Sequence, residues 1–219
     1  MDLTENKNHP EITIVGCGPG AKDYLIPAGR RAIRNAGVLA GTPRLLAIFA
    51  SETQTRINMK KGGVKALLDE IAHHDGLEKI AVLVTGDPGL HSLARNVIRR
   101  FGRSRCRVIP GISSIQTAFA RVALDWQDAH VITAHGVTPV EEFVAISNWN
   151  KIAVLAGGEP SRTWLCSLTA ALGDRYQIVL CSNLTLPDEH VEYISAVEMQ
   201  TASLPSRSVV LFIDKGCLI

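Results

Sequence analysis

Near its amino terminus, this chain has an apolar strand that runs directly into a glycine-rich loop. Residues 12–15 read Ile-Thr-Ile-Val and lead directly into Gly16-Cys17-Gly18-Pro19-Gly20, with three glycines in five positions. Apolar β-branched residues favour a buried strand, and the glycines let the backbone at its carboxyl end approach a ligand closely. The loop alone is compatible with several unrelated nucleotide-binding folds.

The composition indicates a globular α/β chain without an overall charge preference. The 219 residues are 46% hydrophobic and carry a formal net charge of +2, which provides no field for a nucleic acid or a membrane surface. An aromatic content of 5% disfavours stacking of single-stranded bases, and no apolar segment approaches the ~20 residues of a membrane span. The five cysteines form no C-x-x-C pair, which predicts reduced, mostly buried thiols, no metal site and a cytoplasmic location.

Strand-length apolar runs alternate with helical periodicity in the first half of the chain. The expected strands are 11–16, 37–40, 54–58, 79–84 and 105–109. The expected helices between and after them include 62–74, 90–100 and 115–122. This alternation predicts a mostly parallel sheet with helices on both faces.

A second set of strands follows, and it predicts a mixed sheet. The expected strands are 129–134, 151–156, 176–181, 190–194 and 208–213. Helices are expected at 141–149 and 161–172, the second opening with Pro160 and a Ser161 cap. The short connection between the last two strands favours antiparallel pairing. We therefore expect a disordered lead-in at 1–10 and two α/β domains, 11–118 and 119–219.

Three loops rich in small residues follow three strands of the first half. They are Gly16-Cys17-Gly18-Pro19-Gly20, Gly86-Asp87-Pro88-Gly89 and Pro110-Gly111-Ile112-Ser113-Ser114. Because the carboxyl ends of parallel strands share one edge of a sheet, we expect these loops to converge on one ligand site. Each loop taken singly is also compatible with a tight turn.

The residues after the first loop argue against a dinucleotide fold. Such a fold opens a helix at the third glycine and carries an acidic residue at the end of the next strand. Here Pro27 predicts that the helix begins several residues later, and the next strand ends in Ala40-Gly41 without a carboxylate. Rossmann-like methyltransferases usually place an acid just before the loop, where this chain has Val15.

The three loops together resemble the tetrapyrrole methylase family. The resemblance includes residues 21–25 and 110–116 and continues through Thr133-Ala134-His135-Gly136, residues 151–158 and residues 182–189. It covers nearly the whole chain beyond residue 10, and the later segments favour the branch that methylates C-5 of precorrin-7 or cobalt-precorrin-7. Members of this branch usually carry Arg where this chain has Val137.

The resemblance implies a fold, a reaction and partners. It implies two α/β domains with the active site in the cleft between them, S-adenosylmethionine as the cofactor, and C-5 methylation in cobalamin biosynthesis. It also implies a homodimer, and a separate enzyme for C-15 methylation and decarboxylation. Three alternatives stay open: another corrin position, a non-tetrapyrrole acceptor, and a tetrapyrrole-binding protein without catalysis.

The expected site residues combine the loops with the family likeness. The residues expected at the cofactor are Pro19, Gly86, Asp87, Pro88, Leu90, Ser113, Ser114, Ile115, Ala134 and Ala156. Asp87 can accept hydrogen bonds from polar groups of the cofactor, or instead cap a helix expected to begin near Leu90. Ser113 or Ser114 can likewise cap the helix that follows.

Substrate contacts and proton transfer are assigned to other residues. Gly18, Gly20, Arg30 and Arg95 are expected at the substrate, whose many carboxylates require cations; Arg31 and Arg34 share the helix of Arg30. Methyl transfer to a nucleophilic carbon needs alignment and a dry cavity, so no catalytic triad or paired-carboxylate motif is required. A base is needed only if a proton leaves afterwards, and the candidates are His135, His91 and Tyr24.

Overall fold

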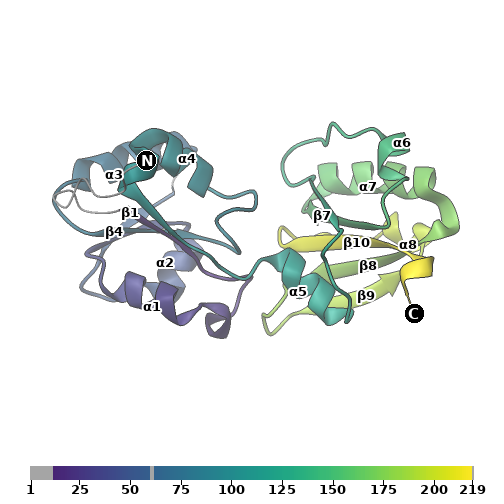
Figure 1. The fold of residues 1–219 in the computed structure, drawn as a ribbon, viewed down its shortest axis with the longest axis horizontal. Coiled ribbons are helices and arrows are strands. Elements are labelled where there is room, and N and C mark those ends of the chain that lie inside the picture. Colours follow the sequence, from purple (N-terminus) through teal and green to yellow (C-terminus); the bar gives the residue numbers. More distant parts are fainter. Residues whose placement is uncertain (1–11, 60–61, 219) are drawn as a thin grey trace. The chain divides into compact units, whose positions relative to one another are not determined.

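The computed structural model describes residues 12–59 and 62–218, which form two compact units. The first extends to Ser113 and the second begins at Ser114, and each has its own five-stranded sheet (Figure 1). The predicted lead-in at 1–10 lies outside the described residues. The limits 11–118 and 119–219 stay a prediction, because compactness does not test whether these segments fold as independent domains.

The first unit is built on a fully parallel sheet with the order β3-β2-β4-β1-β5. The strands are β1 (Ile12–Gly16), β2 (Val38–Gly41), β3 (Thr55–Asn58), β4 (Ile80–Val84) and β5 (Cys106–Ile109). β1 pairs with both β4 and β5, so that Ile14 lies level with Val82 and Val108. The predicted parallel sheet is confirmed, and the loops after β1, β4 and β5 leave the same edge.

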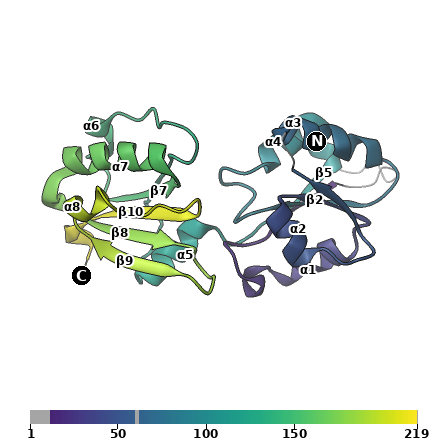
Figure 2. The ribbon, with the colours of Figure 1, turned by 180° about the vertical axis from the view of Figure 1, so that it is seen from behind.

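Helices cover both faces of this sheet, as predicted. They are α1 (Pro27–Arg34), α2 (Pro43–Phe49), α3 (Gly63–His74) and α4 (Ala94–Phe101), with short 3-10 turns η1 (Lys22–Tyr24) and η2 (Arg103–Arg105). Ile12 and Ile14 pack toward α3 and α4, whereas Val15 packs toward α1 and α2. Figures 1 and 2 show these two helix pairs on opposite sides of the strands. The predicted late start at Pro27 is confirmed, since Pro27 opens α1.

The prediction that a helix begins near Leu90 is wrong. α4 begins at Ala94, and residues 90–93 form a turn in which His91 has a φ of +43°. The hydroxyl of Ser92 donates to the Pro88 carbonyl (2.5 Å) and accepts from the Ala94 amide (3.1 Å). A side chain that bonds to nearby backbone in this way competes with helical hydrogen bonds and delays the helix.

The second unit contains a mixed sheet with the order β6-β7-β10-β8-β9. The strands are β6 (His130–Thr133), β7 (Lys151–Ala156), β8 (Tyr176–Ser182), β9 (His190–Ile194) and β10 (Ser208–Asp214). β6 runs parallel to β7, and all other pairings are antiparallel. The prediction that this half contains antiparallel pairing is therefore confirmed. The last two strands do not pair with each other, however: β9 and β10 lie on opposite sides of β8 and both run antiparallel to it, so the connection that contains the one-turn helix α8 (Ala196–Met199) crosses over β8.

The remaining helices pack on the two faces of this sheet. They are α5 (Ser114–Arg121), α6 (Phe143–Ile146) and α7 (Glu159–Leu172), with the 3-10 turns η3 (Gly173–Arg175) and η4 (Lys215–Cys217). α6, α7 and α8 contribute to a core around Val210 and Phe212 of β10, and α5 also contacts β10. The helix expected at 141–149 is only one turn long.

The predicted Ser161 cap is also wrong. α7 begins at Glu159, with Gly158 as its N-cap and Pro160 in its first turn, so Ser161 already lies inside the helix. The Ser161 side chain bonds instead to backbone outside α7, at the Ala134 carbonyl.

A buried lysine secures the segment that precedes β6. Lys151 opens β7 and is 6% exposed, and its ammonium lies 2.9 Å from a carboxylate oxygen of Asp125 and 2.8 Å from one of Asp128. Hydrogen bonds from Lys151 hold the pKa of both aspartates below the usual range, and these aspartates raise the pKa of Lys151. The ion-paired cluster fixes the segment 125–128 against the sheet.

Candidate functional site

The three glycine-containing loops of the first unit meet at one edge of the sheet. Gly18 and Gly86 form an isolated antiparallel bridge, in which the Gly86 amide donates to the Gly18 carbonyl (2.8 Å) and the Gly18 amide donates to Gly86 (3.3 Å). The amide of Cys17 also donates to the Val84 carbonyl (2.9 Å), which extends the β1–β4 pairing into the loops. The predicted convergence of the first two loops is confirmed.

The third loop packs against the other two without intervening side chains. A Cβ atom on Gly16 would lie 2.6 Å from the Gly111 amide nitrogen, and a Cβ on Gly111 would lie 2.3 Å from the Gly86 carbonyl oxygen. Both distances are shorter than carbon atoms can tolerate, so these two positions require glycine. The strand ends therefore form a cradle of closely packed backbone, which suits a ligand that is recognised by backbone groups.

Asp87 ties the second loop to the third. One carboxylate oxygen accepts from the Gly89 amide (2.7 Å) and the other accepts from the Gly111 amide (2.9 Å). The N-cap of α4 is Leu93, so the alternative in which Asp87 caps this helix is wrong. A carboxylate has about four acceptor positions, so these two bonds leave capacity for a ligand.

Other residues expected at the cofactor lie on or beside these loops. Pro19 is buried in the first loop, after β1, and Pro88 is buried in the second loop. Leu90 lies in the turn before α4 and is half-buried. Ser113 is buried, and Ser114 and Ile115 open α5 in the second unit. The roles of these residues at the cofactor stay predictions.

In the second unit, Ala134 directly follows β6 and Ala156 is the last residue of β7, and the two lie next to each other. The amide of Ala134 donates to the Leu155 carbonyl (2.8 Å), and both alanine side chains are buried. The two backbone segments expected to meet adenine are thus adjacent within one sheet.

Ser161 is a residue that the sequence did not single out for this region. Its hydroxyl, 1% exposed, lies 2.6 Å from the Ala134 carbonyl and 3.0 Å from the Gly157 carbonyl, and it accepts from the Gly157 amide (3.1 Å). One side chain therefore holds the segment after β6 against the segment after β7. The available signal was a serine in the first turn of the helix after β7, which equally suits a cap.

The candidate bases occupy different settings. His135 is exposed after β6, and its ring lies over Gly157, where an added Cβ would be 2.7 Å from Nδ1. His91 is exposed in the turn before α4. Tyr24 belongs to η1 and lies against Gly18, where an added Cβ would be 2.9 Å from the Tyr24 Cβ. His135 thus lies beside the loops that Ser161 holds together.

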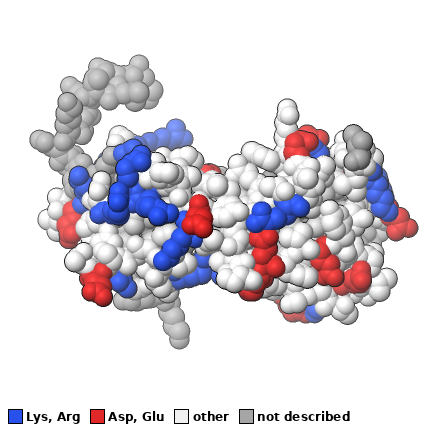
Figure 3. All heavy atoms as spheres, turned by 90° about the horizontal axis from the view of Figure 1, so that it is seen from below, with Lys and Arg blue, Asp and Glu red and all other residues white. Residues whose placement is uncertain are grey.

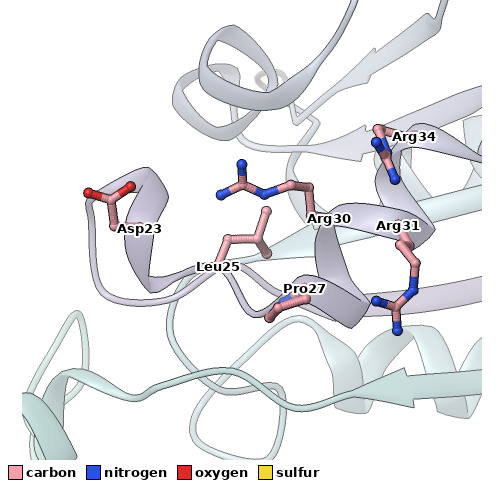
Figure 4. Close-up of a pocket in the computed structure, with 6 residues that line it drawn as sticks. All are labelled: Asp23, Leu25, Pro27, Arg30, Arg31 and Arg34. Atoms are coloured by element: carbon pink, nitrogen blue, oxygen red, sulfur yellow. The ribbon is translucent and has the colours of Figure 1, made fainter.

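The arginines predicted to bind the substrate lie in two different places. Arg30 lines an open pocket of about 470 Å³ on α1, as do Arg31 and Arg34. Figure 4 shows these three guanidinium groups around Leu25 and Pro27, with Asp23 on η1. Arg95 is exposed on α4 and is not part of this pocket.

The cysteines offer no reactive thiolate at the loops. All five are free, but only Cys17 and Cys181 are buried; the other three are half-buried, so the prediction of mostly buried thiols is wrong in part. Burial raises the pKa of Cys17 to about 12 and that of Cys181 to about 12, which keeps both protonated at neutral pH. Cys17 therefore packs in the first loop as a small apolar residue.

Within the described residues, no three His, Cys, Asp or Glu side chains gather into a group that could hold a metal ion. Across residues 12–59 and 62–218, no helix combines the length and apolar character needed to cross a bilayer.

Comparison with known proteins gives a consistent pattern. The model of the tetrapyrrole (corrin/porphyrin) methylases matches residues 11–199. The cobalt-precorrin-7 C(5)-methyltransferase of Salmonella typhimurium is 28% identical over 93% of this chain and 100% of that relative.

Two solved structures share the fold. The precorrin-6Y methylase of Archaeoglobus fulgidus has a TM-score of 0.68 and 24% identity, over 93% of this chain and 97% of the other. The uroporphyrin-III C-methyltransferase of Thermus thermophilus, crystallised with S-adenosylhomocysteine, has a TM-score of 0.69 and 18% identity, over 93% and 92%.

Proposed function

The chain belongs to the tetrapyrrole methylase family, and we propose that it is an S-adenosylmethionine-dependent methyltransferase of cobalamin biosynthesis that methylates C-5 of precorrin-7 or cobalt-precorrin-7. The observation that carries the choice of acceptor is the alignment with a cobalt-precorrin-7 C(5)-methyltransferase over the whole length of that relative. The cradle of backbone at Gly16, Gly86 and Gly111 supports a cofactor site in the first unit.

The residues of the cradle fit S-adenosylmethionine. This group supplies a methyl group activated on a sulfonium, and it also presents an ammonium, a carboxylate, a ribose diol and an adenine. The carboxylate of Asp87 would accept from its polar donors, since it keeps acceptor capacity beyond Gly89 and Gly111. In the second unit, the backbone of Ala134, which Ser161 holds, and that of Ala156 would contact the adenine. Pro19, Leu90 and Ile115 would supply apolar surface.

The chain's contribution to the reaction would be alignment and exclusion of water. A direct displacement at the methyl carbon needs the acceptor carbon in line behind it, which positioning by a packed loop provides. The close packing of Gly16 against Gly111 would restrict the movement of the first and third loops. If a proton leaves the methylated carbon, His135 is the base we favour, because its exposed ring lies against Gly157, which Ser161 also contacts.

Assembly and location follow from the family resemblance. We propose that the protein is a homodimer and acts in the cytoplasm. A separate enzyme would carry out C-15 methylation and decarboxylation, in keeping with the match to a relative named for C-5 alone.

Binding of S-adenosylhomocysteine, measured by isothermal titration calorimetry, tests the cofactor first. Binding below millimolar concentration is expected, and its absence would remove every methyltransferase function. Incubation with precorrin-7 and cobalt-precorrin-7 should then increase the mass of one of them by one methyl group. Turnover of a tetrapyrrole of an earlier pathway stage in preference to both would contradict the assigned acceptor.

A further inference from the structure

The arginine pocket on α1 has the composition of an anion site. Arg30, Arg31 and Arg34 line it together with one acidic residue, Asp23, so the lining carries a net charge of +2. Figure 4 shows the apolar Leu25 and Pro27 at the start of α1, with the guanidinium group of Arg30 directed toward η1 and those of Arg31 and Arg34 further along the helix. Guanidinium groups bind carboxylates in pairs of parallel hydrogen bonds, and the apolar floor suits the methylene carbons that carry them.

These guanidinium groups are not neutralised by the rest of the chain. Within residues 12–59 and 62–218, none of the three arginines forms an ion pair, and Arg30 donates a long hydrogen bond (3.5 Å) to the Lys22 carbonyl. By contrast, Arg100 and Arg105 of the same unit pair with Asp69 and Asp75. The pocket therefore keeps its positive charge for a ligand.

The surrounding charge favours an anion as well. Residues 1–113 contain 17 Lys and Arg against 10 Asp and Glu, which gives +7, whereas residues 114–219 contain 6 against 11, which gives −5. Figure 3 shows Lys and Arg side chains gathered on the face of the first unit seen from below. The first unit is therefore basic, although the net charge of the whole chain is close to zero.

The pocket adjoins the glycine cradle. Tyr24 lies against Gly18 of the first loop, and the next residue, Leu25, already lines the pocket. A ligand large enough to span both would place one end at the loops while its charged side chain lies on α1. A tetrapyrrole with carboxylate side chains around its rim has this shape and charge.

We propose that the pocket formed by Arg30, Arg31 and Arg34 binds a peripheral carboxylate side chain of the tetrapyrrole substrate. This inference rests on the proposed function, because it takes its ligand from that reaction. Asp23, opposite the arginines, limits the site to a small number of carboxylates by repelling further negative charge.

Charge removal at the pocket provides the test. In Arg31→Gln/Arg34→Gln, the KM for the precorrin should rise about 10-fold or more, while the KM for S-adenosylmethionine and the melting temperature stay at wild-type values. Arg31→Lys/Arg34→Lys should recover part of the loss. Arg99→Gln is the matched control: an exposed helical arginine of the same unit, outside the pocket, which should leave both KM values unchanged.

A binding measurement separates this inference from the proposed function. Uroporphyrin I, an octacarboxylate porphyrin, should bind wild type and the Arg99→Gln control equally and the double glutamine variant about 10-fold more weakly, with the difference shrinking at high salt. Equal binding by all three proteins, or equal weakening in the control, would overturn the inference. Wild type that binds S-adenosylhomocysteine but methylates no precorrin would instead refute the proposed function, whatever the porphyrin titration gives.

Discussion

Removal of the Asp87 side chain should loosen the glycine cradle and weaken cofactor binding together. In Asp87→Ala, the amides of Gly89 and Gly111 lose their acceptors at 2.7 and 2.9 Å. A hydrogen bond to a charged group contributes about 1.5–3 kcal/mol, but Asp87 is half-buried and water would replace part of that. We expect a loss of about 1–3 kcal/mol in the affinity for S-adenosylhomocysteine.

The same bonds also stabilise the first unit, so the melting temperature should fall. For a chain of this size, the melting temperature falls by about 2–4 °C for each kcal/mol lost from the free energy of unfolding. Asp87→Asn keeps one acceptor oxygen and should lie between wild type and Asp87→Ala in both measurements. Asp174→Ala, an exposed acid in η3, is the control and should change neither.

Calorimetric titration and thermal denaturation of these four proteins decide between a tether and a direct ligand. Affinity and melting temperature that fall together support the tether. Weaker binding at an unchanged melting temperature would mean that Asp87 acts only on the cofactor. An unchanged affinity and an unchanged melting temperature in Asp87→Ala would mean that Asp87 neither holds the third loop nor contacts the cofactor.

Four further outcomes are expected. Ser161→Ala should weaken S-adenosylhomocysteine binding by about 1 kcal/mol, whereas Ser167→Ala, an exposed serine of the same helix, should not; equal titrations would contradict the role of Ser161. Gly111→Ala should sharply reduce binding, because its Cβ would collide with a backbone carbonyl. The ion pairs of Lys151 lower the pKa of its two aspartate partners, so their stabilisation is present above about pH 4 and is lost as the pH falls through their folded pKa; melting curves of Lys151→Met should therefore depend less on acid pH than those of wild type. The thiol of Cys17 should stay unmodified by iodoacetamide at pH 8 in the native protein. Rapid alkylation of Cys17, detected by peptide mass mapping, would contradict its raised pKa.

Local chemistry made most of the fold predictable. Apolar β-branched runs such as Ile12-Thr13-Ile14-Val15 specify buried strands, and Pro27 specifies a helix start, because each residue acts through its own backbone preferences. The convergence of the loops followed from the parallel sheet, since strands of equal direction end at the same edge.

The roles that could not be predicted from the sequence depend on contacts between segments far apart in the chain. Asp87 bonds to Gly111, 24 positions away, and Ser161 bonds to Ala134, 27 positions away. Both residues are also good cap formers, so local rules predicted a cap at Ser161 and left a cap open as the alternative for Asp87. Ser92 illustrates the opposite case: its bonds to Pro88 and Ala94 are local, but they oppose the helix that the periodicity indicates.

The position of the transferred methyl group decides whether C-5 is the acceptor carbon. The protein is incubated with precorrin-7 or cobalt-precorrin-7 and S-adenosylmethionine carrying a ¹³C-labelled methyl group, and the product is analysed by NMR. A single new ¹³C methyl bonded to C-5 is the predicted result. A labelled methyl on any other ring carbon, or no label in the tetrapyrrole although S-adenosylhomocysteine binds, would contradict it.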